Sequence, residues 1–146
     1  MNKNRRGSIE LSFGMIFSII LIIVFISVAF YAITKFLDFQ NIIKIEKFGD
    51  DLQKDIDDLW KSDQGSYEKE YSLPLKIQSV CFISSKEGFE NMIFVSKSII
   101  EEKLINHIDI QATTVGSSDR ACFENKNGKV SMILKKDFGE NFVTIK

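Results

Sequence analysis

Hydrophobic side chains form one continuous stretch near the amino end of the chain. No charged residue occurs from Leu11 through Thr34, and 19 of these 24 residues are apolar. As a helix rising about 1.5 Å per residue, the stretch would measure roughly 36 Å, more than the ~30 Å hydrocarbon core of a bilayer. The pattern therefore predicts a transmembrane helix, which we place at residues 13–33.

Positive charge is concentrated on one side of this stretch. Lys3, Arg5 and Arg6 precede it, whereas the first positive residue on the far side is Lys35. Because short, positively charged flanks stay in the cytoplasm, residues 1–12 are predicted to form a cytoplasmic basic leader. The chain beyond the helix would then lie outside the membrane.

A cleaved secretory signal is the competing interpretation of the same stretch. Its apolar core would span residues 13–26, and cleavage would follow Ser27-Val28-Ala29. The apolar run continues through that site as far as Ile33, however, which favours a retained anchor over a removed signal peptide.

Apolar residues continue at helical spacing after the charge-free stretch. They recur every three or four positions, with mostly charged residues between them, and residues 34–63 are therefore predicted to continue the helix in amphipathic form. The whole helix would run from about Ser8 to Ser62. Gly49 is its weak point, costing about 1 kcal/mol relative to alanine without ending the helix. The apolar positions are Phe36, Phe39, Ile42, Ile45, Phe48, Leu52, Ile56 and Leu59.

The width of the apolar face changes along this second part of the helix. Over residues 52–60 it is a narrow stripe, which we expect to pack on the chain's own carboxyl-terminal domain. Over residues 36–45 it is broader, because Leu37 and Ile43 join it. One small domain does not cover so wide a face, so we expect it to lie at the membrane surface or against a neighbouring copy.

Short segments with strand-like sequence make up most of residues 64–146. They occur at 70–84, 91–96, 107–114 and 142–145, whereas the capping-box spacing of Ser98 and Glu101 predicts a short helix at about 99–106. Asn127-Gly128, between two further strand-like runs, predicts a tight hairpin, and residues 137–141 predict a turn. The expected fold is α+β: a long transmembrane-to-amphipathic helix followed by a small antiparallel β-sheet headpiece, with the helix packed on one face.

The segment at 70–84 has a more detailed pattern. Ile77, Cys81 and Ile83 share one parity of the alternation, so they are expected on the same face of a strand. Pro74 suits the start or edge of a strand because it has no backbone N–H to donate.

The charge distribution excludes several classes of function. Residues 1–34 have a net charge of +2 and the remaining residues a net charge of −3, and Lys and Arg form no run beyond Arg5-Arg6. A nucleic-acid-binding surface is therefore not expected.

The residues that commonly carry catalysis are sparse in this sequence. His107 is the only histidine, and Asp57-Asp58 and Glu101-Glu102 are adjacent pairs that would point to different sides of a helix. Because the sequence also shows no recognisable catalytic, phosphate-binding or metal-binding motif, we expect no enzymatic activity, cofactor or metal.

The two cysteines, Cys81 and Cys122, both fall in predicted strands. In an extracytoplasmic domain of this size, an even pair predicts a disulfide. The alternatives are two buried free thiols or a metal site, and the single histidine and the lack of Cys-x-x-Cys spacing disfavour the metal site. A disulfide between the two cysteines would close a loop with a sequence separation of 41 residues. In the chain-entropy model, this closure would add roughly 4 kcal/mol to the stability of a small core.

The order of these features resembles type IV pilin-like proteins. A basic leader ending in Arg6-Gly7, the tetrapeptide Ser8-Ile9-Glu10-Leu11, the apolar run and a small β-rich headpiece are most similar to archaeal members with class III signal peptides. In that family a prepilin-type peptidase cuts on the cytoplasmic side, before the apolar helix, and the helices then bundle into a filament.

The resemblance implies roles for residues of the leader. Arg5, Arg6, Gly7 and Ser8 become candidates for leader processing, and Glu10 becomes the charge that pairs with the new terminal amine of a neighbouring subunit. A cut after Gly7 would make Glu10 the third mature residue, and a cut after Arg5 would make it the fifth, which is the position of the family's glutamate. Without processing, Glu10 would be only an acid at a helix start, favourable by about 0.5 kcal/mol.

Two functions follow as expectations. The first is a structural, pilin-like subunit of a cell-surface filament, whose partners are membrane lipid, a prepilin-type peptidase, and other copies or related subunits bound through the amino-terminal helix. The second is a single-pass membrane protein that displays a small, disulfide-closed binding domain outside the cell. Neither function involves nucleic acid.

Overall fold

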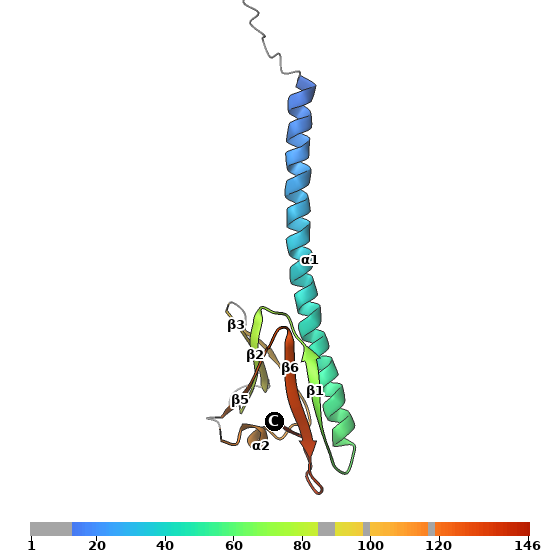
Figure 1. The fold of residues 1–146 in the computed structure, drawn as a ribbon, viewed down its shortest axis with the longest axis vertical. Coiled ribbons are helices and arrows are strands. Elements are labelled where there is room, and N and C mark those ends of the chain that lie inside the picture. Colours follow the sequence, from blue (N-terminus) through green and yellow to red (C-terminus); the bar gives the residue numbers. More distant parts are fainter. Residues whose placement is uncertain (1–12, 85–89, 98–99, 117–118) are drawn as a thin grey trace, which may run out of the picture. The chain divides into compact units, whose positions relative to one another are not determined.

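The computed structural model describes residues 13–84, 90–97, 100–116 and 119–146. The chain divides into two compact units, residues 1–40 and 41–146, and each is described here by itself. Helix α1, Phe13–Trp60, contributes to both units (Figure 1). The described part of the predicted long helix is thus confirmed, and the predicted start near Ser8 lies outside the described residues.

The carboxyl end of α1 is closed by a lysine from a distant strand. The amide N–H groups of Lys61 and Ser62 donate to the carbonyls of Asp57 and Leu59, both at 3.1 Å. The buried Lys136 then donates its ammonium to the carbonyls of Trp60 (2.6 Å) and Ser62 (2.7 Å). A cation at this position satisfies carbonyls that have no partner within the helix and is attracted by the negative end of the helix dipole.

In the described part of the unit of residues 41–146, seven strands form two antiparallel sheets. The strand order is β1-β6-β7 in the first sheet and β4-β3-β2-β5 in the second. The strands are β1 Gly65–Ser72, β2 Ile77–Ile83, β3 Met92–Ser96, β4 Ile100–Lys103, β5 Arg120–Glu124, β6 Lys129–Lys136 and β7 Thr144–Ile145, and a short helix, α2 Ile110–Thr114, precedes β5. The α+β expectation is confirmed, with two sheets in place of one.

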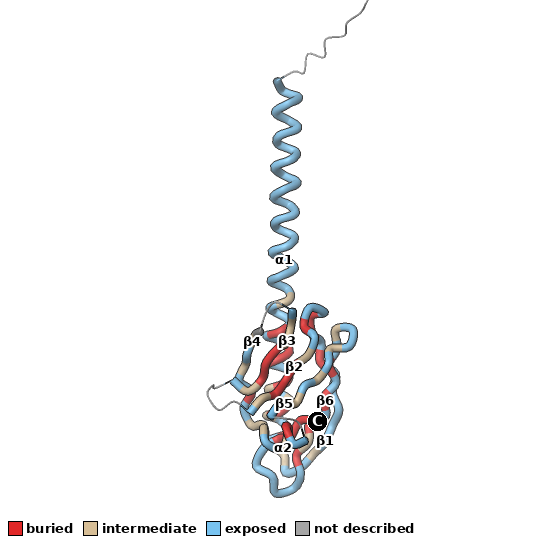
Figure 2. The backbone as a smooth tube through the Cα atoms, turned by 90° about the vertical axis from the view of Figure 1, so that its left-hand side faces the viewer, coloured by how far each residue is buried: buried red, intermediate tan, exposed pale blue. Residues whose placement is uncertain are grey.

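One hydrophobic cluster holds this unit together. Both sheets and the carboxyl part of α1 contribute to it, and Figure 2 shows the buried segments along the strands. The helix contributes one face, formed by Ile45, Phe48, Leu52, Ile56 and Leu59. The prediction that the narrow stripe packs on the chain's own headpiece is therefore confirmed for its aliphatic members, and it extends further toward the amino end than expected.

Phe48 occupies a central place in this cluster. Its ring is 1% exposed, and it meets Tyr71 of β1 and Phe94 of β3 edge-on, with ring centroids 5.4 and 5.5 Å apart. Edge-to-face pairs are favourable because the positive ring edge approaches the negative ring face. A single helical side chain thus contacts one strand from each sheet.

Asp55 connects the polar side of α1 to β1. Its carboxylate accepts the phenol O–H of Tyr71 at 2.7 Å and the ammonium of Lys69 at 2.7 Å, and its backbone carbonyl accepts the O–H of Tyr67 at 2.9 Å. Burial raises the pKa of Tyr71, and the hydrogen bond to Asp55 raises it further. The phenol therefore stays protonated and keeps donating at all ordinary pH values.

Gly49 provides space for a lysine rather than marking a weak point. A Cβ atom at this position would lie 2.6 Å from both Cδ and Nζ of Lys103, which reaches across the helix from the end of β4. The Lys103 ammonium lies 2.9 Å from the carboxylate of Asp50 and 3.4 Å from the carbonyl of Glu46. The helix continues through Gly49 without interruption.

Two of the predicted elements have the wrong type. The segment expected to be a helix at 99–106 contains β4, which pairs with β3 from Met92↔Lys103 to Val95↔Ile100; Ser98, the expected capping residue, lies outside the described residues. The segment expected to be a strand at 107–114 contains α2, whose first turn is capped by Asp109 accepting from the N–H of Ala112 at 2.8 Å. At 99–106, pairing with the edge of β3 had more influence on the structure than the local capping signal. At 107–114, the helix cap provided by Asp109 had more influence than the alternation of apolar and polar residues.

The predicted strand at 70–84 is two strands. The end of β1 and the whole of β2 are separated by a turn in which the N–H of Ile77 donates to the carbonyl of Pro74 at 3.0 Å. A register shift between Ile77 and Ser79 then reverses the parity, so that Ile77, Val80 and Phe82 belong to the hydrophobic cluster, whereas Cys81 is buried but lies outside that cluster. The expectation that Ile77, Cys81 and Ile83 share one face is wrong, because a bulge inserts a residue between them.

The turn at Asn127-Gly128 is confirmed, but its flanking strands do not form a long hairpin. Both residues have positive φ, 55° and 84°, and Lys126 and Lys129 exchange backbone hydrogen bonds across the turn at 2.8 and 3.1 Å. Beyond this pair the chain diverges, because β5 pairs with β2 in one sheet and β6 pairs with β1 in the other. The turn thus connects the two sheets.

The carboxyl end follows the prediction. In the turn after β6, the N–H of Glu140 donates to the carbonyl of Asp137 at 3.1 Å, and Gly139 has a φ of 86°. The chain then returns as β7, which pairs with β6 at Leu134↔Ile145 and Lys135↔Thr144.

Candidate functional site: the exposed apolar surface of the long helix

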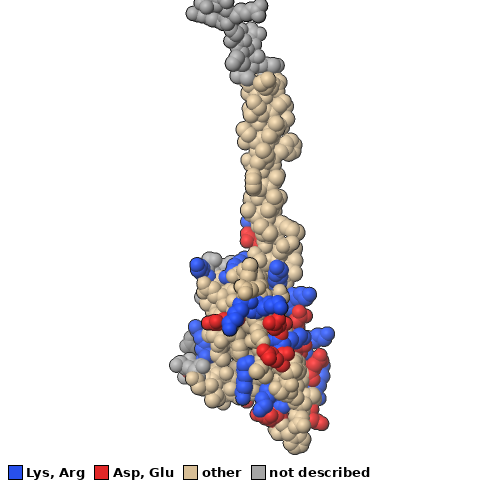
Figure 3. All heavy atoms as spheres, viewed as in Figure 1, with Lys and Arg blue, Asp and Glu red and all other residues tan. Residues whose placement is uncertain are grey.

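The amino part of α1 presents an apolar surface that carries no charged residue from Phe13 to Thr34. From Phe13 to Gln40 every side chain is exposed, and Lys35 and Asp38 are the only charged residues. Among the described residues, α1 is the one helix whose length and apolar composition allow it to cross a membrane, and the apolar window lies near the amino end of the chain. Figure 3 shows this surface free of Lys, Arg, Asp and Glu over most of its length (Figure 3).

Three hydroxyl groups within the apolar segment are satisfied by the helix itself. Ser18 donates to the carbonyl of Gly14 and Ser27 to that of Ile23, both at 2.8 Å, and Thr34 donates to that of Tyr31 at 2.8 Å. Because these donors are satisfied within the helix, the three residues are compatible with an apolar environment.

The apolar surface continues past the charge-free stretch. Phe36, Leu37 and Phe39 in the first unit are exposed, and so are Ile42 and Ile43 at the start of the second. The next apolar residue, Ile45, is buried in the core of the headpiece. Apolar positions of α1 therefore belong to two sets: those that the headpiece covers, from Ile45 onward, and those that no described residue covers.

The predicted processing and assembly residues cannot be placed in this geometry. Arg5, Arg6, Gly7, Ser8 and Glu10 all lie outside the described residues. Their roles stay predictions from the resemblance.

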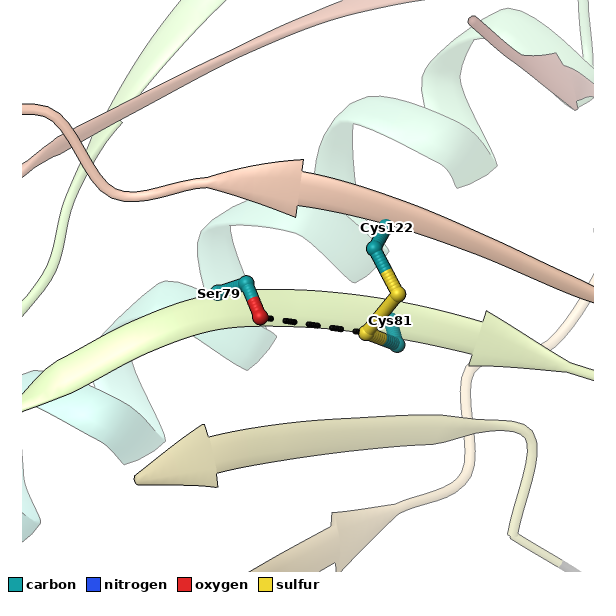
Figure 4. The surroundings of a disulfide bond; sticks show 3 residues. All are labelled: Ser79, Cys81 and Cys122. Carbon is teal, nitrogen blue, oxygen red and sulfur yellow. Dashed lines mark hydrogen bonds between the residues drawn. A yellow bond between two sulfur atoms is a disulfide. The ribbon is translucent and has the colours of Figure 1, made fainter. Parts of the chain in front are cut away.

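The predicted disulfide is present. Cys81 of β2 and Cys122 of β5 are directly opposite each other in the sheet and are bonded through their sulfur atoms (Figure 4). Cys81 is buried and Cys122 is exposed, and the hydroxyl of Ser79 lies 3.9 Å from Cys81 Sγ. The bond joins two neighbouring strands of one sheet and fixes the position of β5, which is an edge strand.

His107 forms a polar cluster with the last turns of α1, which sequence reasoning did not predict. Its Nδ1 lies 2.8 Å from Oδ1 of Asp57, and its ring stacks on Trp60 with centroids 3.9 Å apart. Asp57 also accepts the amide N–H of Gln53 at 2.8 Å, and the side-chain carbonyl of Gln53 accepts the N–H of Asn106 at 2.8 Å. The cluster attaches the segment before α2 to the helix, in agreement with a structural histidine.

The electrostatics of this cluster follow from its hydrogen bonds. The bond from His107 lowers the pKa of Asp57, burial opposes that change, and the bond from Gln53 lowers the pKa further. The sequence signal for the cluster was the spacing of Gln53, Asp57 and Trp60, which places these residues on one side of a helix. The positive φ of His107, 63°, which turns the chain toward them, has no comparable signature in the sequence.

The described part of the headpiece has shallow grooves. One of them, about 510 Å³, is lined mainly by α2, β5 and the carboxyl end, including Val115, Phe123 and Ile145. Among the described residues, no three His, Cys, Asp or Glu side chains come together as a potential metal site.

Fold and surface together define a class: an α+β protein whose long amino-terminal helix is an apolar candidate membrane span, followed by a disulfide-bonded β headpiece. Comparison of the chain with known protein families, with curated proteins and with solved structures finds no match.

Proposed function

We propose that this chain is a structural, pilin-like subunit anchored in the cell membrane, which assembles through its apolar amino-terminal helix into a cell-surface filament or a related complex. The basic leader would be removed on the cytoplasmic side by a prepilin-type peptidase, and the headpiece would lie outside the cell. The disulfide supports this orientation, because such bonds persist in oxidising compartments.

The observation that carries the proposal is the length of the uncovered apolar surface on α1. From Phe13 to Ile43 the helix extends about 46 Å at the standard rise, whereas the hydrocarbon core of a bilayer needs only about 30 Å. A plain anchor has no use for the excess, which includes Phe36, Phe39 and Ile42, all exposed. Helices of neighbouring subunits would cover it, because large exposed apolar patches mark interaction surfaces.

Glu10 has a defined part in this proposal. A carboxylate close to the lipid needs a partner, and the amino end of a neighbouring processed helix would supply both a positive charge and a favourable dipole. Replacement of Glu10 by Gln would remove that pairing while keeping the size and hydrogen-bonding capacity of the side chain.

Intact-mass measurement of the native protein is the first test. We expect a mature mass that lacks the first five to seven residues, and recovery of the protein in filaments sheared from cells. If membranes yield only the chain with its leader intact, and sheared fractions contain none of it, the proposal is wrong.

Two matched variants test the helix surface. Phe39→Ser should abolish assembly while leaving membrane anchoring and headpiece unfolding unchanged, because Phe39 is exposed. Glu10→Gln should also impair assembly, whereas Glu46→Gln, which removes the same charge from an exposed position of the same helix, should not. A displayed binding domain, the alternative function, predicts no effect from any of the three substitutions.

A further inference from the structure

We propose that headpieces of this protein join head to tail, with the turn Asp137–Glu140 of one copy docking into a groove beside Leu75 of the next. This inference rests on the proposed function, because it assigns a second contact surface to a filament subunit. The two surfaces are complementary in charge, and each carries an apolar side chain that its own chain leaves exposed.

The docking turn has an ordered backbone and carries an exposed aromatic side chain. Phe138 is 81% exposed. The N–H of Glu140 donates to the carbonyl of Asp137 at 3.1 Å, and Oε2 of Glu140 accepts the N–H of Asp137 at 2.9 Å, so the turn is closed from both sides. Because the backbone is already ordered, burying Phe138 against a partner costs little conformational entropy, and aromatic anchors of this kind carry much of the binding energy in interfaces.

The receiving groove, about 470 Å³, lies on the headpiece where the chain passes between β1 and β2. It is lined by Asn41 and Lys44 of α1, by residues 72–76 and by the turn Asn127-Gly128. Leu75 is 79% exposed there. The groove thus provides an apolar contact for Phe138 beside polar backbone groups.

Charge favours this pairing over a pairing of like surfaces. The groove lining includes two cationic side chains, Lys44 and Lys76, and none of its described residues is acidic. Lys76 also takes part in an interaction within its own chain, so Lys44 is the cation that we assign to the contact. The turn carries two carboxylates: Asp137 pairs with Lys135 of its own chain, and Glu140 supplies the second. Opposite charges at the two surfaces steer the encounter and disfavour contacts between two grooves or two turns.

Strand β6 places the two surfaces at opposite ends of the headpiece. Gly128 of the groove directly precedes β6, and Asp137 of the turn directly follows it; in Figure 1 the arrow of β6 ends at that turn. Eight residues of strand separate them by roughly 26 Å. A contact between two different surfaces adds copies head to tail instead of pairing two of them, and it generates an open polymer when the rotation between successive copies does not close a ring.

Cysteine cross-linking of the full-length protein tests this arrangement. Both native cysteines are consumed in the disulfide, so the double variant Leu75→Cys/Phe138→Cys carries the only free thiols. Mild oxidation of assembled material should give a ladder of dimers, trimers and longer species, because each copy can bond to two neighbours. Either single variant has one thiol and can give nothing longer than a dimer.

A matched control places the second thiol elsewhere on the same strand. Ile133 is exposed near the middle of β6, and Leu75→Cys/Ile133→Cys should give no ladder. The charge reversal Lys44→Glu should reduce the ladder of the first double variant several-fold, and Glu140→Lys added to it should restore the ladder.

The outcomes separate this inference from the proposed function. Filaments that form normally, yet give no ladder with Leu75→Cys/Phe138→Cys, would overturn the head-to-tail contact and leave the filament proposal standing. Absence of filaments and of leader processing would overturn both. If Leu75→Cys is shielded from a membrane-impermeant thiol reagent before assembly and never cross-links, lipid headgroups occupy the groove, and the inference is wrong.

Discussion

Substitution of Gly49 by alanine tests whether Lys103 lies over the helix as described. Helix propensity alone predicts that Gly49→Ala stabilises the protein by about 1 kcal/mol. The structure predicts a loss as well, because the new Cβ would lie 2.6 Å from Cδ of Lys103 and would displace that side chain.

The size of the loss follows from what Lys103 contacts. Its ammonium pairs with Asp50 at 2.9 Å, and its side chain is 33% exposed, so the ion pair contributes about 0.2–1 kcal/mol. The packing of its aliphatic stem on Gly49 adds a comparable amount. Gain and loss nearly cancel, and we expect Gly49→Ala to change the free energy of unfolding by less than about 0.5 kcal/mol.

A double-mutant cycle separates the two effects. In a Lys103→Ala background no side chain obstructs the new methyl group, so Gly49→Ala should recover the full gain of about 1 kcal/mol. The expected coupling energy between the two positions is therefore about 0.5–1.5 kcal/mol.

The assay is urea unfolding of the full-length protein in detergent micelles, followed by the fluorescence of Trp60. Trp60 is the only tryptophan and stacks on His107, so its emission reports loss of the native headpiece. A Gly49→Ala gain near 1 kcal/mol that is the same in both backgrounds would refute the placement of Lys103 over Gly49.

Three further predictions concern the headpiece. Replacement of both Cys81 and Cys122 by serine should lower the free energy of unfolding by up to about 4 kcal/mol, measured in the same unfolding assay against the oxidised protein; equal stability of the two would contradict it. Phe48→Ala should cost about 3–5 kcal/mol because it leaves a cavity among rings of both sheets, and a loss below 1 kcal/mol would show that the ring is not central. Because the pKa of Asp57 is lowered in the folded state, its contribution is fully present above the unfolded value near 3.8 and is lost as the pH falls through the folded value. His107→Ala should therefore flatten the stability profile in that acid range, and an unchanged profile would exclude the His107 hydrogen bond as the cause.

The long helix was predictable because its signals are strong and local. An uncharged apolar run and regular spacing from Phe36 to Leu59 identify a helix without any knowledge of the remaining chain. The buried face from Leu52 to Leu59 followed from the same spacing. The disulfide followed from composition, because two cysteines in a small domain allow only one intramolecular pairing.

The sheet was harder to predict because its elements depend on distant partners. Residues 65–69 of strand β1 were missed because, of the eight residues of β1, only Tyr71 is buried, and the charged residues between Gly65 and Ser72 give no alternation to detect. Strand β4 resembles a helix start in sequence and became a strand because β3 offered an edge. The separation of β5 and β6 into different sheets is set by their partners β2 and β1, and the Asn127-Gly128 turn carries no information about it.

The candidate site also has one part that could be predicted from the sequence and one part that could not. The exposed apolar positions of α1 could be read from the sequence, because the number of apolar residues exceeds what one bilayer and one small core require. The cluster of Asp57, Trp60 and His107 could not, since it joins residues about fifty positions apart in sequence and depends on the left-handed backbone of His107.

The placement of α1 in the headpiece core affects how the chain can fold during synthesis. Phe48 and Leu52 are made early, yet they share one cluster with Val130 of β6 and Ile145 of β7, near the other end of the chain. A core built from such distant segments has a high contact order and cannot be completed until β7 has been translated. Until then the apolar face of the helix is exposed to other nascent chains and can aggregate with them. The rate at which the last strands are synthesised would therefore set how much of the protein aggregates before it folds.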